Sequence, residues 1–137
     1  MTIENKAVVE RFYREVVNQK DLDILHEVMA EDYTEHGNPD GSGIEGFKRF
    51  VQGLSAAFPD LTITVEDLIA EADKVVARVT VEATHAGVFM GSVEPTGRHV
   101  TFSGVDVFHI EDGKIVGRWN LRDLLGLLRQ LGVTTLP

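Results

Sequence analysis

The chain has 137 residues, 43% of them hydrophobic, which is enough for one domain to bury a core without metal or disulfide crosslinks. It has no cysteine, which excludes disulfides, thiolate metal sites and a cysteine nucleophile. A formal charge of −9 at pH 7 argues against binding to nucleic acid or anionic membranes, so we expect a small molecule or a second copy of the chain as partner. The charged N-terminus and the short apolar runs predict neither a signal peptide nor a transmembrane helix, and they favour a cytoplasmic protein.

Apolar residues at helical spacing predict three helices in the first half of the chain. The first runs from about Ile3 to Asn18. Asp21 is the expected N-cap of a shorter helix that continues to about Met29. The stretch from about Asp32 to Gly43 is rich in glycine and turn-forming residues, which predicts a loop. The third helix spans Ile44 to Phe58 and ends at the following proline.

The hydrophobic period then changes to two, which predicts strands over Leu61–Ile69, Val75–His85 and Val100–Ile110 and a further strand after the Asp112-Gly113 turn. A connection from Gly87 to Gly97 separates the second and third strands, and Leu124–Leu131 reads as a short closing helix. Helices followed by a meander of strands predict a single α+β domain over residues 1–137. In such a domain, helices cover one face of a strongly curved antiparallel sheet and leave room for a pocket.

The register of the last hairpin decides which side chains face the interior. A two-residue turn pairs Ile110 with Ile115, Asp106 with Trp119 and Phe102 with Asp123. This register predicts that Asp106, Trp119 and Asp123 share an apolar inner face, whereas Arg118 faces outward. A carboxylate in apolar surroundings loses hydration and becomes a better proton acceptor, so the two aspartates indicate acid/base chemistry.

Three long segments of the chain carry a family resemblance: NKAVVERFYREVVNQKDLDILHEVMAEDYTEH, AFPDLTITVEDLIAEADKVVARVTVEATHAGVFMG and PTGRHVTFSGVDVFHIEDGKIVGRWNLRDLLGLLRQLG. Together they resemble the SnoaL-like polyketide cyclases of the nuclear transport factor 2-like superfamily. The most specific pieces are AFPDL, the segment ATHAGVFMG, PTGR, and Trp119 followed four residues later by Asp123. The resemblance implies a cone-shaped α+β barrel with a deep pocket, assembly into dimers or higher oligomers, and no cofactor.

The resemblance also implies roles for individual residues. In the cyclases an aspartate near the end of the last strand is the general acid/base of an intramolecular aldol closure, and Asp123 matches that position. His36, three residues after Tyr33, matches a pocket histidine. His85 ends an inward-facing alternation and is a second candidate for contact with the ligand. The expected pocket wall or core comprises Phe47, Phe50, Phe89, Met90 and Trp119. Tyr33 and Asp106 are further candidates for contact with the ligand.

Each candidate also has a structural interpretation. Asp123 is a favoured N-cap for the closing helix, and Asp106 is equally explained by a structural hydrogen bond to Trp119 or to a backbone N–H group. His36 and His85 are explained as hydrogen-bonded histidines of the core or rim. The histidine and carboxylate spacings show no metal-binding pattern, and no phosphate loop or nucleophile motif occurs.

The sequence therefore predicts a cofactor-independent cyclase or isomerase acting on a small apolar carbonyl substrate. Asp123 is the expected base, and His36 or His85 binds the carbonyl oxygen. One alternative is a non-catalytic binding or dimerisation module. Another is an epoxide hydrolase, which needs an Asp-Arg-Asp arrangement, but the predicted register puts Arg118 and Arg122 on the wrong face. The predicted dimer contact is the outer sheet face with Thr80, Glu82, Thr101, Val107 and Arg118.

Overall fold

The computed structural model describes residues 2–135 and 137, and it contains the predicted helices. The N-terminal helix comprises α1 (Thr2–Arg11) and a π-helical continuation (Phe12–Asn18). A short 3-10 turn (Leu22–Ile24), with Asp21 as its N-cap, leads directly into α2 (Leu25–Val28). The other two helices are α3 (Gly43–Ala57) and α4 (Leu124–Gln130).

The five strands form one mixed sheet in the order β1-β5-β4-β3-β2. Their bounds are β1 (Met29–His36), β2 (Thr62–Glu71), β3 (Lys74–Thr84), β4 (His99–Glu111) and β5 (Lys114–Arg122). Neighbouring strands are antiparallel except for β1 and β5, which are parallel.

Strand β1 corrects the predicted loop that began at Asp32. Its residues, MAEDYTEH, do not alternate regularly between buried and exposed, because the register with β5 shifts between Met29 and Thr34. An edge strand of this kind depends on pairing with a strand far along the chain, so a period-two pattern does not reveal it.

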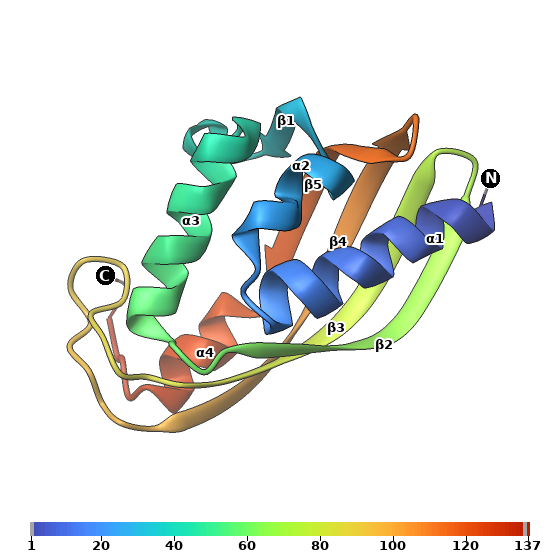
Figure 1. Ribbon diagram of the computed structural model, residues 1–137. Helices are drawn as coiled ribbons and strands as arrows, with labels where there is room; N and C mark the ends of the chain where they lie inside the picture. The colour runs from blue at the N-terminus through green and yellow to red at the C-terminus, as the bar shows by residue number, and fades with distance from the viewer. Residues whose placement is uncertain (1, 136) are drawn as a thin grey trace.

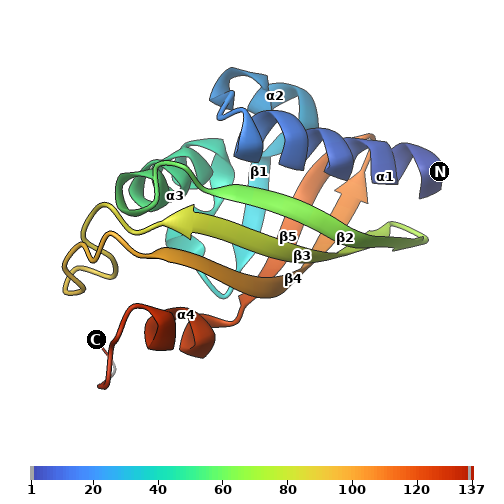
Figure 2. The same cartoon turned by 90° about the horizontal axis from the view of Figure 1, so that it is seen from below.

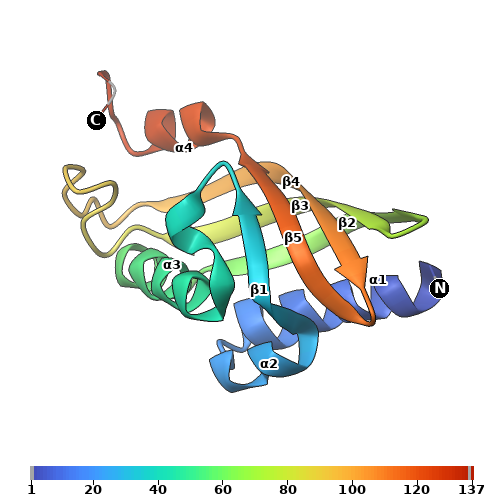
Figure 3. The same cartoon turned by 90° about the horizontal axis from the view of Figure 1, so that it is seen from above.

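The helices and the sheet form two layers, with α1 and α3 covering one face of the curved sheet (Figure 1). In the view of Figure 2, β2, β3 and β4 lie below α1, α2 and α3, and α4 lies below β4. The sheet stays open, since β1 and β2 are its two edges. The end of α3, the loop after β3 and the C-terminal segment lie at the same end of the molecule (Figure 3). Aromatic rings fill the core between the layers, with Phe12 contacting Tyr13, Phe47 and Phe108 at centroid distances of 5.4 to 5.6 Å.

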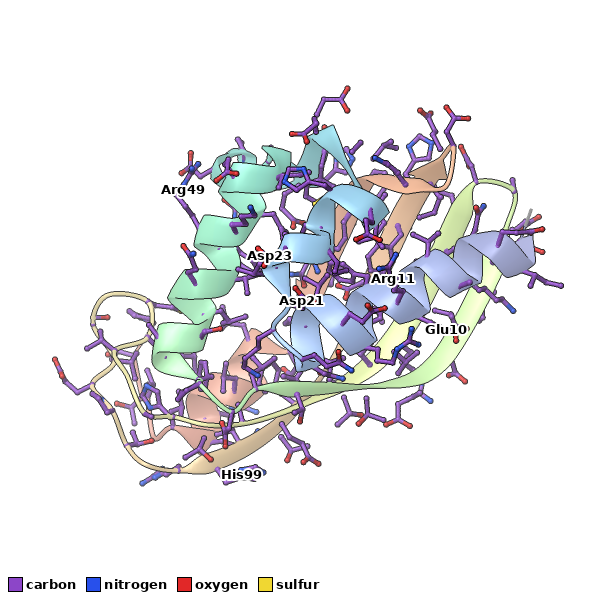
Figure 4. The ribbon with its side chains drawn as sticks, viewed as in Figure 1. Glu10, Arg11, Asp21, Asp23, Arg49 and His99 are labelled. Atoms are coloured by element: carbon purple, nitrogen blue, oxygen red, sulfur yellow. The ribbon has the colours of Figure 1, made fainter. Side chains whose placement is uncertain are left out.

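Charged side chains project from the outside of these layers. Figure 4 shows Glu10 on α1, Arg49 on α3 and His99 at the start of β4 at the periphery, and all three are exposed. In the part of the chain that the structure describes, no helix is both long enough and apolar enough to cross a membrane.

The turn between β4 and β5 is the predicted one. Asp112 and Gly113 have φ angles of 50° and 76°, as both central residues of a type I′ turn require, and Ile110 pairs with Ile115. The register then shifts between His109 and Ile110, which is a β-bulge. Asp106 therefore pairs with Asn120, and the predicted pairing of Asp106 with Trp119 is wrong.

The bulge reverses the predicted faces of β5. Arg118 pairs with Phe108 on the inner face and is 3% exposed, whereas Trp119 pairs with Val107 on the outer face and is 39% exposed. The strand ends at Arg122, which pairs with Gly104, so the predicted pairing of Phe102 with Asp123 is also wrong. A one-residue register shift moves every following side chain to the other face. Arg118 therefore does not belong to the outer sheet face.

Candidate active site

A cavity of about 880 Å³ lies between α3, the inner face of the sheet and α4. Most of its wall is apolar, formed by Val17, Phe47, Phe50, Val51, Leu54, Phe58, Leu61, Ile63, Val81, Phe89, Phe102, Leu121, Leu124 and Leu127. Its polar lining includes Lys20, Glu35, His36, Asn38, Ser55, Arg118, Asn120 and Arg122. The volume and the apolar wall suit a ligand of drug-like size with few polar groups.

The polar side of the cavity contains a buried ion pair between β1 and β5. Arg118 donates from Nε and Nη2 to Oε1 of Glu35 at 3.2 and 2.8 Å, and the Tyr33 hydroxyl donates to the same oxygen at 2.8 Å. The side chains of Arg118 and Glu35 are each 4% exposed. The guanidinium also lies 5.8 and 5.3 Å from the ring centroids of Phe12 and Phe47. Parallel pairing of β1 with β5 places Glu35 directly opposite Arg118, so the fold itself creates this pair.

A second ion pair lies on β4 and β5. Arg122 donates from Nη1 and Nη2 to the two oxygens of Asp106 at 2.8 and 3.1 Å, and the Tyr13 hydroxyl donates to Oδ2 at 2.5 Å. Asp106 has no exposed surface. Nη1 of Arg118 lies 4.0 Å from the same Oδ2, so Arg118 stands between the carboxylates of Glu35 and Asp106.

These neighbours shift the pKa values of the groups around them. Burial, and then the negative charge of Asp106, raise the pKa of Tyr13 well above its usual range. Burial also raises the pKa of Tyr33, although the charge of Arg118 opposes that shift. Burial disfavours the charged form of Arg118, but the acidic groups of Tyr33, Asp106 and Glu35 outweigh burial and raise its pKa. Both tyrosines therefore remain neutral hydrogen-bond donors, and Arg118 remains a cation.

Two buried acceptors of the lining have no hydrogen-bond partner among the described residues. They are Oε2 of Glu35 and Oδ1 of Asn120. A buried polar atom without a partner costs free energy, and such atoms are concentrated at functional sites. The polar side of the cavity therefore has hydrogen-bonding capacity that the protein itself does not use.

The predicted aromatic wall is largely present in the cavity lining. Phe47, Phe50 and Phe89 line the cavity. Trp119 also borders it, although its side chain lies on the opposite face of β5 from Arg118, and its ring stacks on His36 with 3.9 Å between centroids and 8° between planes. Met90 is 50% exposed and is not among the lining residues.

The remaining predicted residues lie outside the cavity lining. Tyr33 and Asp106 are buried behind it and hydrogen-bond to Glu35 and Arg122. His85 is fully buried, and its Nδ1 accepts from the backbone N–H of Thr96 at 3.2 Å. This contact indicates the neutral tautomer with the proton on Nε2. Of the two candidate histidines, only His36 lines the cavity, whereas His85 is a buried, hydrogen-bonded residue outside it.

Asp123 is the N-cap of α4. Its Oδ1 accepts from the backbone N–H of Gly126 at 2.9 Å, and the side chain is exposed and absent from the cavity lining. The structural role that the sequence allowed for Asp123 is confirmed. Its catalytic role stays a prediction.

Of the polar lining residues, the sequence analysis predicted only His36; it missed Lys20, Asn38 and Ser55, and also Glu35, Arg118, Asn120 and Arg122. Arg118, Asn120 and Arg122 are every second residue of β5, and this period of two was the sequence signal that they share one face of the strand. The predicted register assigned the alternation to the wrong face. The position of Glu35 had no such signal, because it depends on the parallel pairing of β1. Among the described residues, no group of three histidine or carboxylate side chains is arranged to hold a metal ion.

A family model for SnoaL-like polyketide cyclases matches residues 7–131. The chain belongs to this family. Solved structures named as SnoaL-like polyketide cyclases share its fold, with sequence identities of 26% and 27%. A search of curated proteins found no match.

Three further solved structures illustrate the likeness. TsrD from Streptomyces laurentii is 33% identical with a TM-score of 0.86, and the alignment covers 96% of each chain. IdmH from Streptomyces antibioticus, a proposed polyketide cyclase, is 34% identical with a TM-score of 0.82 over 94% of this chain and 99% of its own. AclR from Streptomyces galilaeus, a proposed hydroxylase, is 32% identical with a TM-score of 0.84 over 100% and 87%. The fold thus occurs with more than one proposed chemistry, so the function must be argued from the site.

Proposed function

We propose that this SnoaL-like protein is a cofactor-independent cyclase or isomerase for an apolar carbonyl compound. Its task is to remove a proton from the carbon next to a carbonyl group and to return a proton elsewhere. The observation that supports this best is a carboxylate, Glu35, in the wall of a largely apolar cavity. Tyr33 and Arg118 both donate to one of its oxygens, and the other has no partner.

In the proposed reaction Glu35 is the general base. It takes the proton, and the electrons of the broken C–H bond move into an enolate. The enolate carbon then attacks a second carbonyl of the same molecule, and the acid form of Glu35 returns the proton to the new alkoxide. For isomerisation, the proton returns to a different carbon. Tyr33 and Arg118 fix the carboxylate in place, which saves the cost of orienting it during the reaction.

Asp123 is the competing base, because the family resemblance assigns this role to it. Its exposure, its hydrogen bond to Gly126 and its absence from the lining favour a capping role. The geometry of the cavity supports Glu35 over Asp123.

The deciding experiment measures deuterium incorporation from D₂O at the acidic carbon of 2-acetylnaphthalene and of a β-keto ester. Glu35→Gln keeps the size of the side chain and an oxygen for Tyr33 and Arg118 but cannot take a proton. We expect it to lower the exchange rate on the order of a hundredfold to ten-thousandfold. Asp123→Asn is the matched control, and it should exchange at nearly the wild-type rate. The opposite ranking would assign the base to Asp123. Exchange at the protein-free rate in all three proteins, with binding retained, would favour a non-catalytic binding module.

Epoxide hydrolysis is a second candidate, and a specific contact favours it. Arg118 contacts Glu35 at 2.8 Å and Asp106 at 4.0 Å, which is an arginine between two carboxylates on the inner face. The predicted outward position of Arg118, which argued against this reaction, is wrong. Formation of a diol from styrene oxide in wild type but not in Glu35→Gln would support this candidate. Loss of exchange in Glu35→Gln without diol formation in wild type would exclude it.

A further inference from the structure

The two arginine side chains of the cavity differ in how exposed they are. Arg118 gives Nε and Nη2 to Glu35, lies near two aromatic rings and is 4% exposed at its side chain. Arg122 is 19% exposed at its side chain. A guanidinium has five N–H groups, and three of those on Arg122 donate to Asp106 and to the Leu121 carbonyl. Its Nε–H and one Nη2–H have no partner among the described residues.

The position of Arg122 depends on the absence of a side chain at Gly104. Gly104 lies opposite Arg122 on β4. A Cβ atom at Gly104 would lie 2.6 Å from both Cδ and Nη1 of Arg122 and 2.5 Å from the Leu121 oxygen. The arginine side chain thus crosses the glycine to reach Asp106, which Tyr13 holds from behind at 2.5 Å. A glycine, an aspartate and a tyrosine together fix this guanidinium at the cavity wall.

We infer that Arg122 binds the carbonyl oxygen of the ligand, and that Gly104, Asp106 and Tyr13 position it for this contact. This inference rests on the proposed function, because it identifies the group that receives the negative charge of the enolate. The ion pair with Asp106 makes the pair neutral overall, so the ligand it suits is a neutral ketone or ester whose oxygen becomes negative during reaction. Hydrogen bonds from a charged donor are the stronger class, and a fixed donor stabilises charge that develops in a transition state.

Arg118 donates to Glu35. The lining has several further side chains that could donate to a carbonyl oxygen, of which Lys20 and His36 are the ionisable ones. Lys20 is exposed, and its Nζ donates to the Leu61 carbonyl at 3.2 Å. His36 stacks on Trp119 and is one of the two histidines, with His85, that the sequence analysis expected to bind the carbonyl oxygen. Neither is held by a buried carboxylate and a glycine cradle as Arg122 is, so His36 is the control position.

The test compares two ligands of the same planar shape by equilibrium dialysis: 2-acetylnaphthalene and 2-isopropenylnaphthalene, in which CH₂ replaces the carbonyl oxygen. Wild type should bind the ketone about tenfold more tightly or better, as expected for a hydrogen bond to a charged donor. Arg122→Met should bring the two dissociation constants to a ratio of about one, as removal of that bond requires. Gly104→Ala should do the same while keeping the charge, because it displaces the guanidinium. His36→Phe should keep the preference.

Retained binding of 2-isopropenylnaphthalene shows that a variant is folded, so loss of the ketone preference alone is informative. Equal binding of both ligands by wild type would overturn the inference, and so would a preference that survives Arg122→Met. Loss of the preference in His36→Phe would assign the contact to His36 instead. Exchange of the ketone's methyl protons is measured separately. A ketone preference without proton exchange would support the role of Arg122 and reject the proposed reaction. Proton exchange without a ketone preference would support the proposed reaction and reject the role of Arg122.

Discussion

Raising the pH above about 10 should unfold this protein, because both of its tyrosines are buried hydrogen-bond donors. Tyr13 and Tyr33 are 2% and 1% exposed, and each donates to a buried carboxylate. An ionised tyrosine at either position could no longer donate this hydrogen bond, and its negative charge would lie next to the negative charge of the carboxylate. Burial therefore raises the pKa of both groups in the folded state.

The sign and size of the effect follow from proton linkage. Above the ordinary tyrosine pKa of about 10, the unfolded chain loses both protons while the folded chain keeps them. The folded state then binds more protons, so its stability is complete below about pH 10 and falls as the pH rises. Each tyrosine contributes about 1.4 kcal/mol per pH unit, and the two together about 2.7. Between pH 10 and 12 the loss is about 5 kcal/mol, comparable to the whole stability of a marginal domain.

The assay follows tyrosinate absorbance and far-ultraviolet circular dichroism in one alkaline titration. Because the chain has no other tyrosine, the two signals should change together in one transition. Tyr13→Phe and Tyr33→Phe should each halve the slope of unfolding free energy against pH above the ordinary tyrosine pKa. Tyrosinate absorbance that rises at the ordinary pKa while the dichroism stays native would refute the reasoning, since it would show an accessible tyrosine.

Three further predictions concern the ion pair, the helix cap and the outer face. Arg118→Met leaves Glu35 buried without its partner, which should cost about 3–5 kcal/mol. The entropy of unfolding is about 0.29 kcal/mol/K for 137 residues, so the loss should lower Tm by about 10–17 °C in thermal unfolding. Adding Glu35→Leu to Arg118→Met should recover most of this loss. Asp123→Ala should cost about 1 kcal/mol in urea unfolding as a lost N-cap, and Asp123→Asn should cost much less; equal losses would contradict the capping contact. The outer sheet face with Thr80, Glu82, Thr101 and Val107 stays the predicted dimer contact, and Val107 does not line the cavity, so Val107→Glu should give a monomer in light scattering. A monomeric wild type at about tens of micromolar, where a specific interface of ordinary size should hold, would remove that proposal.

Much of the fold could be predicted from the sequence, because periodicity is a local property. The helical spacing in α3, the alternation in β3 and the Asp112-Gly113 turn each depend on residues within a few positions of one another. The resemblance to SnoaL-like cyclases likewise rests on long segments that remain recognisable without coordinates, and the family match over residues 7–131 confirms it. The apolar wall from Phe47, Phe50 and Phe89 followed from the same patterns.

The polar side of the cavity was decided by tertiary structure. One bulge between His109 and Ile110 turns Arg118 and Arg122 inward and Trp119 outward, and the Asp112-Gly113 turn residues do not predict this bulge. Glu35 reaches Arg118 only because β1 pairs with a strand more than seventy residues later, from Lys114 to Arg122. Register and long-range pairing are set by the sum of contacts across the whole sheet. The sequence by itself therefore indicated that a cavity forms and which aromatic residues line part of it, and the assembled sheet determined which charges face the ligand.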